Sequence, residues 1–203
     1  MKPLYCLIVL FSLALPSFAQ EADWKAQEPP EAAAKVSKAV VKGDTAVVED
    51  RGLIKTTKKF EKGCTLEFTW KFTKGRDEGA YQDVLSVVFR TDGKQREKHS
   101  HEIEDGLAVR FAAHAKTISV ERFVRGQQSS EFITRVPATM DRGKEYKIKI
   151  HETKGFLVVH FGDSDRPVLE VKTPTPVGGH VAIYNRERGP AQQISILSGL
   201  KIK

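Results

Sequence analysis

Length, composition and charge already exclude several classes of protein. The chain has 203 residues, 40% of them hydrophobic and 29% charged, and a formal net charge of +7. This size fits a single domain whose core is large enough to fold without disulfide bridges. A nucleic-acid binder concentrates its cations on one face, whereas here acidic residues are interleaved with the basic ones, so we expect no nucleic-acid partner. A weak attraction to an acidic polysaccharide or a charged cell surface is expected instead.

The first 19 residues have the pattern of a secretory signal peptide. Lys2 precedes an apolar run from Leu4 to Leu15, and the small-residue pattern Ser17-Phe18-Ala19 follows. This arrangement predicts cleavage before Gln20 and a secreted or periplasmic protein. The run is shorter than the about 20 apolar residues of a membrane helix, so no membrane insertion is expected. Removing it leaves Cys64 as the only cysteine, which excludes an intrachain disulfide.

Residues 20–43 differ in kind from the rest of the chain. Pro29-Pro30 is followed by Glu-Ala-Ala-Ala-Lys and by an apolar stretch from Val36 to Val41. This composition predicts an N-terminal linker or a short helix, with Glu31 favourably placed at the helix start.

Beyond Gly43 the hydrophobic pattern has a period of two. Between Cys64 and Phe72 the even-numbered residues are apolar and the odd-numbered ones polar. This alternation predicts a strand with one face in a core and the other in water. Trp70 shares the apolar face, so we expect it in the core rather than as a sugar-stacking platform.

The clearest hairpin spans Glu145 to Gly162, with Lys154-Gly155 as a two-residue turn. This turn places Ile148 opposite Phe161 and Ile150 opposite Val159. A slip of one residue would expose every apolar side chain, so the register is strongly specified. His151 and His160 become diagonal neighbours on the polar face, where a solvated surface is favoured over a metal pair because no third ligand is near.

Further short strands are separated by turn signals such as Thr91-Asp92-Gly93-Lys94. They are expected at Thr45 to Glu49, Leu53 to Thr57, Val84 to Thr91, Leu107 to Ala113, Thr117 to Phe123, Phe132 to Val136, Val168 to Val171, His180 to Asn185 and Ile194 to Ile202. About a dozen strands without amphipathic helices predict an all-β domain over residues 44–203, a two-sheet antiparallel β-sandwich or jelly roll.

Four predicted strand segments near the C-terminus resemble those of a known superfamily. The runs are GKEYKIKI from Gly143, GFLVVHFG from Gly155, GGHVAIYN from Gly178 and ISILSGLKI from Ile194. Their order resembles the C-terminal half of the concanavalin A-like lectin/glucanase sandwiches. Within that superfamily it is most similar to laminin G-like and 3-keto-disaccharide hydrolase-type domains of secreted bacterial proteins. Because the resemblance rests on strand pattern and glycines, it is specific for fold and carries little about activity.

The resemblance implies that a concave sheet binds glycans or other ligands. Candidate ligand residues are the polar ones that alternate out of the core, namely Arg90, Arg110, His180, Tyr184 and Arg186. Sugar recognition combines planar rings with fork-shaped donors and carboxylates. The alternative is that these side chains form cross-strand ion pairs with Glu121 or Glu187.

The sequence His99-Ser-His-Glu-Ile-Glu-Asp105 contains the strongest candidates for catalytic residues. On a regular strand Glu102 and Glu104 would lie on one side, about 6.6 to 6.8 Å apart. Laminarinase-type hydrolases carry a related motif, and retaining hydrolysis needs two carboxyls about 5 to 5.5 Å apart. Gly106 stands where that motif has its acid, so Glu102 and Glu104 are catalytic candidates without a complete motif.

Two segments have residues that could bind a metal ion, although an ordinary polar surface is favoured for both. His99 and His101 could bind zinc with one remote ligand. Asp163-Ser-Asp165 offers carboxylates for calcium, which the resemblance makes the commoner metal. Neither motif is complete, so no cofactor is expected, with calcium as the alternative.

The sequence therefore favours an exported β-sandwich that binds a carbohydrate or a surface polymer. A glycoside hydrolase or related enzyme acting on modified sugars is the first alternative, and a structural or adhesion module is the second.

Overall fold

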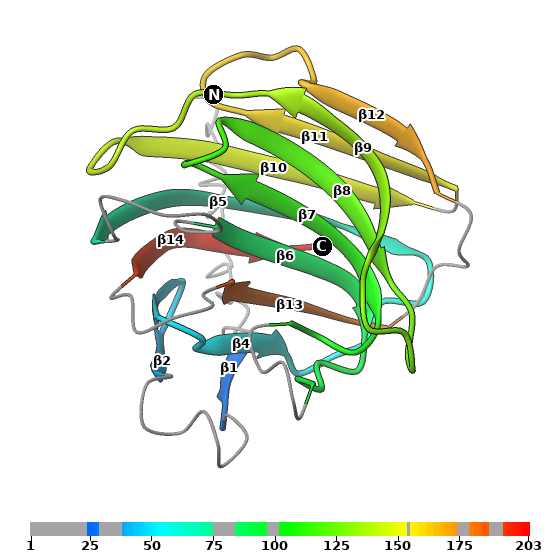
Figure 1. Ribbon diagram of the computed structural model, residues 1–203. Coiled ribbons are helices and arrows are strands. Elements are labelled where there is room, and N and C mark those ends of the chain that lie inside the picture. The colour runs from blue at the N-terminus through cyan, green and yellow to red at the C-terminus, as the bar shows by residue number, and fades with distance from the viewer. Residues whose placement is uncertain are drawn as a thin grey trace, which may run out of the picture.

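The structure is a two-layered β-sandwich. The computed structural model describes residues 24–28, 38–74, 84–96, 102–153, 155–173, 179–186 and 193–203. These residues form fourteen strands and no helix, arranged in two seven-stranded antiparallel sheets that lie one in front of the other (Figure 1). The expected fold class, an all-β antiparallel sandwich, is confirmed.

We name the two layers sheet A and sheet B. Sheet A has the order β1 (Trp24–Gln27), β4 (Leu53–Thr56), β13 (His180–Asn185), β6 (Val84–Thr91), β7 (Gly106–Ala112), β8 (Thr117–Phe123) and β9 (Glu131–Pro137). Sheet B has the order β12 (Leu169–Lys172), β11 (Phe156–Phe161), β10 (Glu145–Thr153), β5 (Gly63–Lys74), β14 (Ile194–Ile202), β3 (Thr45–Glu49) and β2 (Lys38–Lys42).

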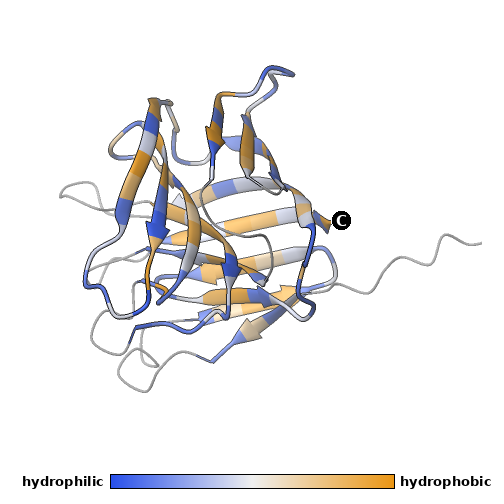
Figure 2. Ribbon diagram, turned by 90° about the vertical axis from the view of Figure 1, so that its right-hand side faces the viewer, coloured by the Kyte–Doolittle hydropathy of each residue, from blue (hydrophilic) through white to orange (hydrophobic). Residues whose placement is uncertain are grey.

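The core lies between the sheets and is built from the apolar side of each alternation, as the banded colouring of the strands shows (Figure 2). Trp70 is fully buried there and stacks on Phe72 with ring centroids 5.0 Å apart, which confirms the prediction that it is a core residue. Its indole N–H donates to the Ser195 hydroxyl at 3.1 Å, and Ser195 donates to the Asn185 side chain at 2.7 Å. This chain of hydrogen bonds joins the two sheets through the core.

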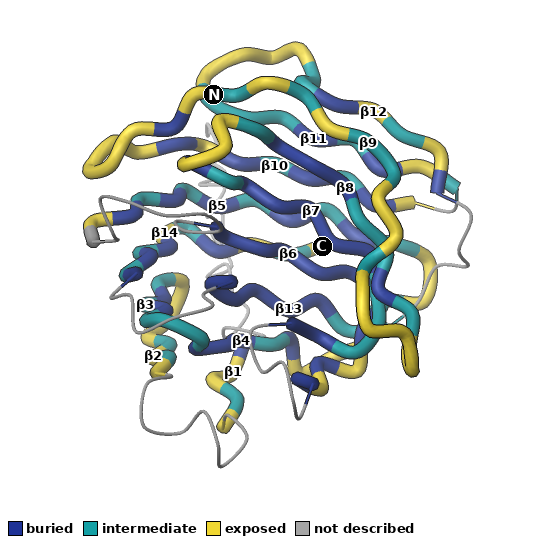
Figure 3. The backbone as a smooth tube through the Cα atoms, viewed as in Figure 1, coloured by how far each residue is buried: buried dark blue, intermediate teal, exposed yellow. Residues whose placement is uncertain are grey.

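The predicted hairpin register is confirmed. Ile148 pairs with Phe161 and Ile150 with Val159. Gly155 has a φ of +88°, a backbone conformation that favours glycine at this turn. The central strands are largely buried, whereas the loops and the edge strand β9 are exposed or half-buried (Figure 3).

The N-terminal expectation needs correction. Residues 38–42, expected in a linker or short helix, form β2, and residues 24–27 form β1, so the sandwich begins before residue 44. Lys42 pairs with Thr45 across the two-residue turn Gly43-Asp44, where Gly43 has a φ of +59°. Ala39 and Val41 pack on the core, and Trp24 is 5% exposed within it. Within β2 the half-buried residues Ala39 and Val41 alternate with exposed ones, which is the period of a strand and not of a helix.

The predicted signal peptide lies outside the described residues. Within the described part of the chain, no helix has the length and apolarity needed to cross a membrane. Cys64 is buried, and burial raises its pKa to about 12.

Candidate functional site

The outer face of sheet A, which points away from the core, carries the candidate site. Strand register defines a central row of side chains on this face. The row runs from β4 to β9 through Leu53, Tyr184, Ser86, Arg110, Ser119 and Arg135. A second row beside it runs through Ala182, Val88, Ala108, Glu121 and Phe132. Charged and polar residues therefore alternate with apolar ones on this face.

Two segments of the connection between β6 and β7 cover part of this face. Gln95 and Ile103 form an isolated bridge between them. Ile103 is fully buried and packs in an apolar cluster with Leu53, Val88, Ala108, Phe123, Ala182 and Tyr184. These two segments, around Gln95 and Ile103, bring the charged side chains of Arg96 and Glu102 onto the outer face of sheet A.

Glu102 is the centre of a buried charge cluster. Its carboxylate accepts a hydrogen bond from the Arg186 guanidinium and lies 3.7 Å from nitrogens of both Arg96 and Arg110. The four side chains are each at most 10% exposed. Charges this far from water interact strongly, so the cluster holds the covering segment on the sheet.

Arg110 connects this cluster to the next strand. Its Nη1 lies 2.5 Å from Glu121 of β8, and its guanidinium lies 5.0 Å from the Phe123 ring centroid. The Nε and Nη2 atoms are buried and make no hydrogen bond to any described residue. The alternative that Arg110 pairs with Glu121 is therefore what the structure shows.

Tyr184 lies beside these charges in the central row. It is fully buried, and this burial raises the pKa of its hydroxyl, against an opposing effect of Arg110 and Arg186. The structure thus brings together four of the sequence-predicted residues: Glu102, Arg110, Tyr184 and Arg186.

Sequence reasoning missed the accessible margin of this face on β8 and β9. Phe132 is 59% exposed and lies opposite Glu121, and the Arg135 guanidinium lies 5.9 Å from its ring centroid. A register shift between Val120 and Glu121 puts Phe132 and Arg135 on the same face although they are three residues apart. Strict alternation could not reveal this pairing.

Arg90 and His180 do not join the cluster. Arg90 has a φ of +61°, and its side chain turns between the sheets, where it pairs with Glu152 of β10 and is 4% exposed. The prediction that Arg90 lies on the ligand-binding face is therefore wrong. His180 Nδ1 lies 2.9 Å from the Thr56 carbonyl oxygen, on the far side of a β-bulge from Ala182.

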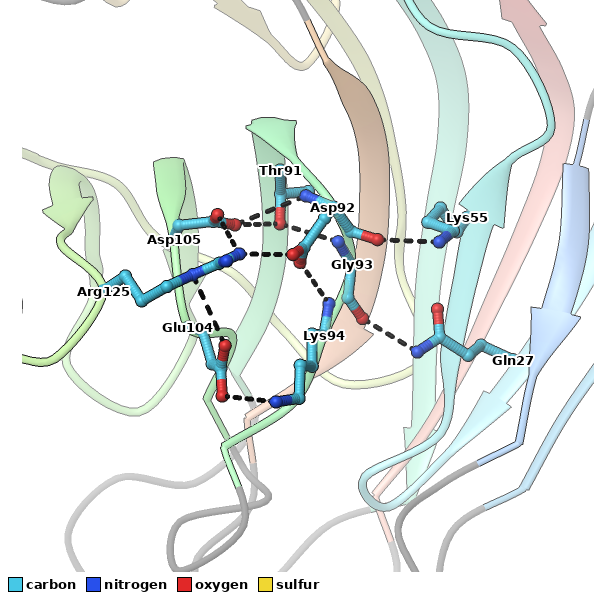
Figure 4. A network of polar contacts seen from close by, with 9 residues as sticks. All are labelled: Gln27, Lys55, Thr91, Asp92, Gly93, Lys94, Glu104, Asp105 and Arg125. Carbon is cyan, nitrogen blue, oxygen red and sulfur yellow. Dashed lines mark hydrogen bonds and ion pairs between the residues drawn. The ribbon is translucent and has the colours of Figure 1, made fainter.

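Glu102 and Glu104 do not form a carboxylate pair. They lie in a bent segment rather than on a strand, and Glu104 joins a separate network with Lys94 at 3.3 Å and Arg125 at 3.6 Å. In this network Arg125 points at Asp92, Glu104 and Asp105 from the turn after β8 (Figure 4). The expectation of two catalytic carboxylates on one side of a strand is wrong, because backbone bending sends them to different cations.

The outer face of sheet B carries a broad groove of about 680 Å³. Two of the three lysines that line it are paired with acids, with Lys147 2.9 Å from Asp163 and Lys149 2.9 Å from Glu67. His151 and His160 lie in it as diagonal neighbours with ring centroids 6.1 Å apart. No three histidine, cysteine, aspartate or glutamate side chains among the described residues are grouped to hold a metal ion. His99 and His101 lie outside the described residues.

Comparison with known proteins places the fold. No protein-family model and no curated protein matches the chain. Carbohydrate-binding module CBM66 from Bacillus subtilis is similar with a TM-score of 0.62 at 12% identity, over 91% of this chain and 97% of that one. The legume lectin-like domain from Entamoeba histolytica has a TM-score of 0.62 at 8% identity over 89% of each chain. The exoplasmic/lumenal domain of VIP36, solved in a Ca²⁺- and mannose-bound form, has a TM-score of 0.58 at 13% identity, over 89% of this chain and 82% of that one. The chain therefore shares the two-sheet β-sandwich fold of these carbohydrate-binding and lectin-like domains.

Proposed function

We propose that this protein binds a carbohydrate on the outer face of sheet A, where the buried charge cluster meets the margin of β8 and β9. The observation that carries the proposal is the Arg110–Glu121 pair next to the exposed ring of Phe132. Sugar sites combine an aromatic ring, which packs on sugar C–H groups, with charged groups that bind paired hydroxyls. Here Arg110, Glu121 and Phe132 lie on the adjacent strands β7, β8 and β9.

The cluster supports binding through rigidity. Glu121 accepts hydrogen bonds from the hydroxyls of Ser119 and Ser130 in addition to its ion pair with Arg110. A carboxylate held by three partners keeps one orientation, so a ligand that uses it loses little side-chain entropy on binding. The similar structures named for carbohydrate binding, CBM66 and mannose-bound VIP36, add support at the level of fold.

The biological setting we propose is outside the cytoplasm. The sequence pattern of residues 1–19 supports export, and the ligand would then be a free saccharide or a cell-surface polymer. The order of the predicted strands and the glycine runs support our proposal that the chain is related to the laminin G-like or 3-keto-disaccharide hydrolase-type domains. Binding without hydrolysis is our proposal, because Glu102 and Glu104 belong to separate networks.

The test is a glycan microarray with the intact protein, followed by calorimetric titration of each saccharide that binds. Two matched variants are Glu102→Gln in the cluster and Glu104→Gln outside it. We expect Glu102→Gln to weaken binding and Glu104→Gln to leave it unchanged. Since Glu102→Gln also leaves buried guanidinium groups less neutralised, Glu121→Gln serves as a second site variant, and circular dichroism verifies that each variant folds.

Each outcome bears on the proposal. Binding to no saccharide would refute it. Binding that survives Glu121→Gln but is lost on replacing Lys147 and Lys149 by alanine would move the site to the groove of sheet B. Release of reducing ends from a bound saccharide, abolished by Glu102→Gln while binding persists, would show an enzyme instead.

A further inference from the structure

We propose that His151 and His160, on the outer face of sheet B, bind a divalent transition-metal ion such as Zn²⁺ or Cu²⁺. The two residues lie on the neighbouring strands β10 and β11 and line the groove of about 680 Å³. The sequence alone favoured a solvated surface for this pair, since it offered no third ligand. Three features of the folded protein favour a metal ion instead: the spacing of the rings, a partner that orients one of them, and open space beside both.

The two imidazole rings are close enough to share one ion. Lys149 of β10 pairs with His160 of β11, so His151, two residues further along β10, is the diagonal neighbour of His160. The ring centroids lie 6.1 Å apart, with an angle of 78° between the ring planes. Zinc lies about 2.0–2.1 Å from an imidazole nitrogen, so two rings that share an ion have centroids roughly 5–6 Å apart. A small rotation of one side chain therefore brings both rings to the same ion.

Thr65 of β5 orients the ring of His151. Its hydroxyl oxygen lies 2.8 Å from His151 Nδ1, and the two residues are directly opposite in the register of β5 and β10. When Nδ1 carries the proton, it donates to the Thr65 oxygen, and the lone pair of Nε2 is left for a metal ion. Metal-binding histidines usually make such a hydrogen bond through the nitrogen that does not bind the ion. One of the two ligands is thus held in place before the ion binds.

The groove leaves room for the other ligands of the ion. Both histidines are half-buried, and His160 makes no hydrogen bond or ion pair to another described residue. Gly162 and Gly199 also line the groove, and a Cβ atom at either position would meet no atom within 4 Å. Two protein ligands leave coordination positions for water or for a donor atom of a bound molecule, as in zinc sites that keep an open position.

Lys149 and Glu67 set the charge around the histidine pair. Glu67 lies opposite Lys149, with its carboxylate 2.9 Å from the lysine amine, and is the diagonal neighbour of His151 on β5. An ammonium group beside the histidines opposes the binding of a cation, whereas a carboxylate released from it attracts one. Lys149→Met should therefore tighten metal binding several-fold, and this gain should vanish when Glu67 is also replaced by glutamine.

The experiment is a metal titration of the intact protein after treatment with a chelator, followed by calorimetry and by the histidine ring signals in nuclear magnetic resonance. We expect Cu²⁺ to bind more tightly than Zn²⁺, and Ca²⁺, which prefers oxygen ligands, not to bind to this pair. Zn²⁺ should shift the ring signals of His151 and His160. Replacing either histidine by glutamine should weaken Zn²⁺ binding by at least about tenfold, and Thr65→Val should weaken it roughly tenfold through loss of the orienting hydrogen bond.

Two controls separate this pair from the other histidines of the chain. His114→Gln, in the exposed turn between β7 and β8, should leave Zn²⁺ binding unchanged. A double variant with glutamine in place of His99 and His101 removes the other histidine pair that the sequence offers for zinc, and it should also leave the site intact. Circular dichroism verifies that each variant folds.

A failure of this inference is distinguishable from a failure of the proposed function. Absence of both Zn²⁺ and Cu²⁺ binding would overturn the inference. Binding that survives the loss of both His151 and His160, or that disappears with His99 and His101, would overturn it as well. None of these outcomes depends on saccharide binding at sheet A, which the glycan microarray tests separately.

Discussion

Arg90 of β6 and Glu152 of β10 form an ion pair that crosses the space between the two sheets. Arg90 Nε donates to Glu152 Oε1 at 2.6 Å, and the two side chains are 4% and 3% exposed. Arg90 Nη2 also donates to the Thr173 hydroxyl at 3.1 Å. Burial raises the pKa of Glu152, which Arg90 opposes. The pair ties the sheets together at a place where an apolar contact would otherwise be expected.

Replacing Glu152 by glutamine should therefore destabilise the fold. The variant leaves a buried guanidinium without its anion, which costs about 3–5 kcal/mol. Urea unfolding followed by tryptophan fluorescence measures this loss. The matched control is Glu145→Gln on the same strand, whose exposed pair with Lys71 spans 3.6 Å and should contribute no more than about 1 kcal/mol. Equal effects of the two variants would contradict a stabilising inter-sheet pair.

The alternation along β10 gives a second prediction. Ile150 is fully buried opposite Val159 and Leu66, whereas the side chain of the preceding residue, Lys149, faces solvent. Ile150→Ala should lower the free energy of unfolding by about 2–5 kcal/mol through lost burial and a cavity. Lys149→Ala should change it by no more than about 1 kcal/mol, because it removes one exposed ion pair. The same urea titration measures both, and a reversed order would show that the strand register is wrong.

Arg125 should control the dynamics of the segment that carries Glu102. Its guanidinium pairs with Asp92, Glu104 and Asp105, and the Lys94 amide donates to Asp92 at 2.8 Å (Figure 4). Burial would raise the pKa of Asp92, but the hydrogen bonds from Lys94 and Arg125 outweigh it and lower this pKa. Arg125→Ala should speed amide hydrogen exchange at Lys94 and Glu104 several-fold. Amides in the middle of β6 should keep their rates, since a local opening leaves the core intact. Unchanged exchange at Lys94 would show that the exposed pairs do not hold this segment.

His151 should make stability depend on pH. Burial lowers the pKa of its imidazole below the ordinary value of 6.5, and the charges of Lys149 and His160 lower it further. The unfolded chain then binds a proton at a higher pH than the folded one, so stability falls as the pH drops through about 6.5 and is regained toward neutral pH. His151→Gln should flatten this slope in urea midpoints measured from about pH 7 to about pH 5.

Nuclear magnetic resonance provides the direct readout for His151. Its titration midpoint should lie below 6.5 and should rise in Lys149→Ala, because one neighbouring positive charge is removed. A midpoint at or above 6.5 in the unmodified protein would disagree with the environment described here.

Local pattern predicted the strands well. The bounds of β3, β6, β8, β13 and β14 match the expected ranges, and the β10–β11 register is as expected. Side-chain alternation depends on neighbouring residues alone, so it can be read along the chain. The hairpin of β2 and β3 was also readable, from Gly43-Asp44 between two β-branched runs, but the helix-favouring residues before it concealed the signal.

The candidate site was predictable only in part. Alternation identified Arg110, Tyr184 and Arg186 as outward-pointing residues, and the structure brings them to one face of sheet A. It misplaced Arg90, because a positive φ at a bulge reverses which side a residue faces. Phe132 and Arg135 escaped notice for the same reason, since a register shift in β9 aligns residues of opposite parity.

The order of residues was thus enough to assign a two-layered antiparallel sandwich, its core side chains and most strand limits, because a period of two is a property of consecutive residues. Folding in three dimensions was needed to join Glu102 to Arg186, to separate it from Glu104 and to place Phe132 beside Glu121. These contacts depend on bulges and on a bent covering segment. Their geometry follows from packing between distant parts of the chain, which no local pattern contains.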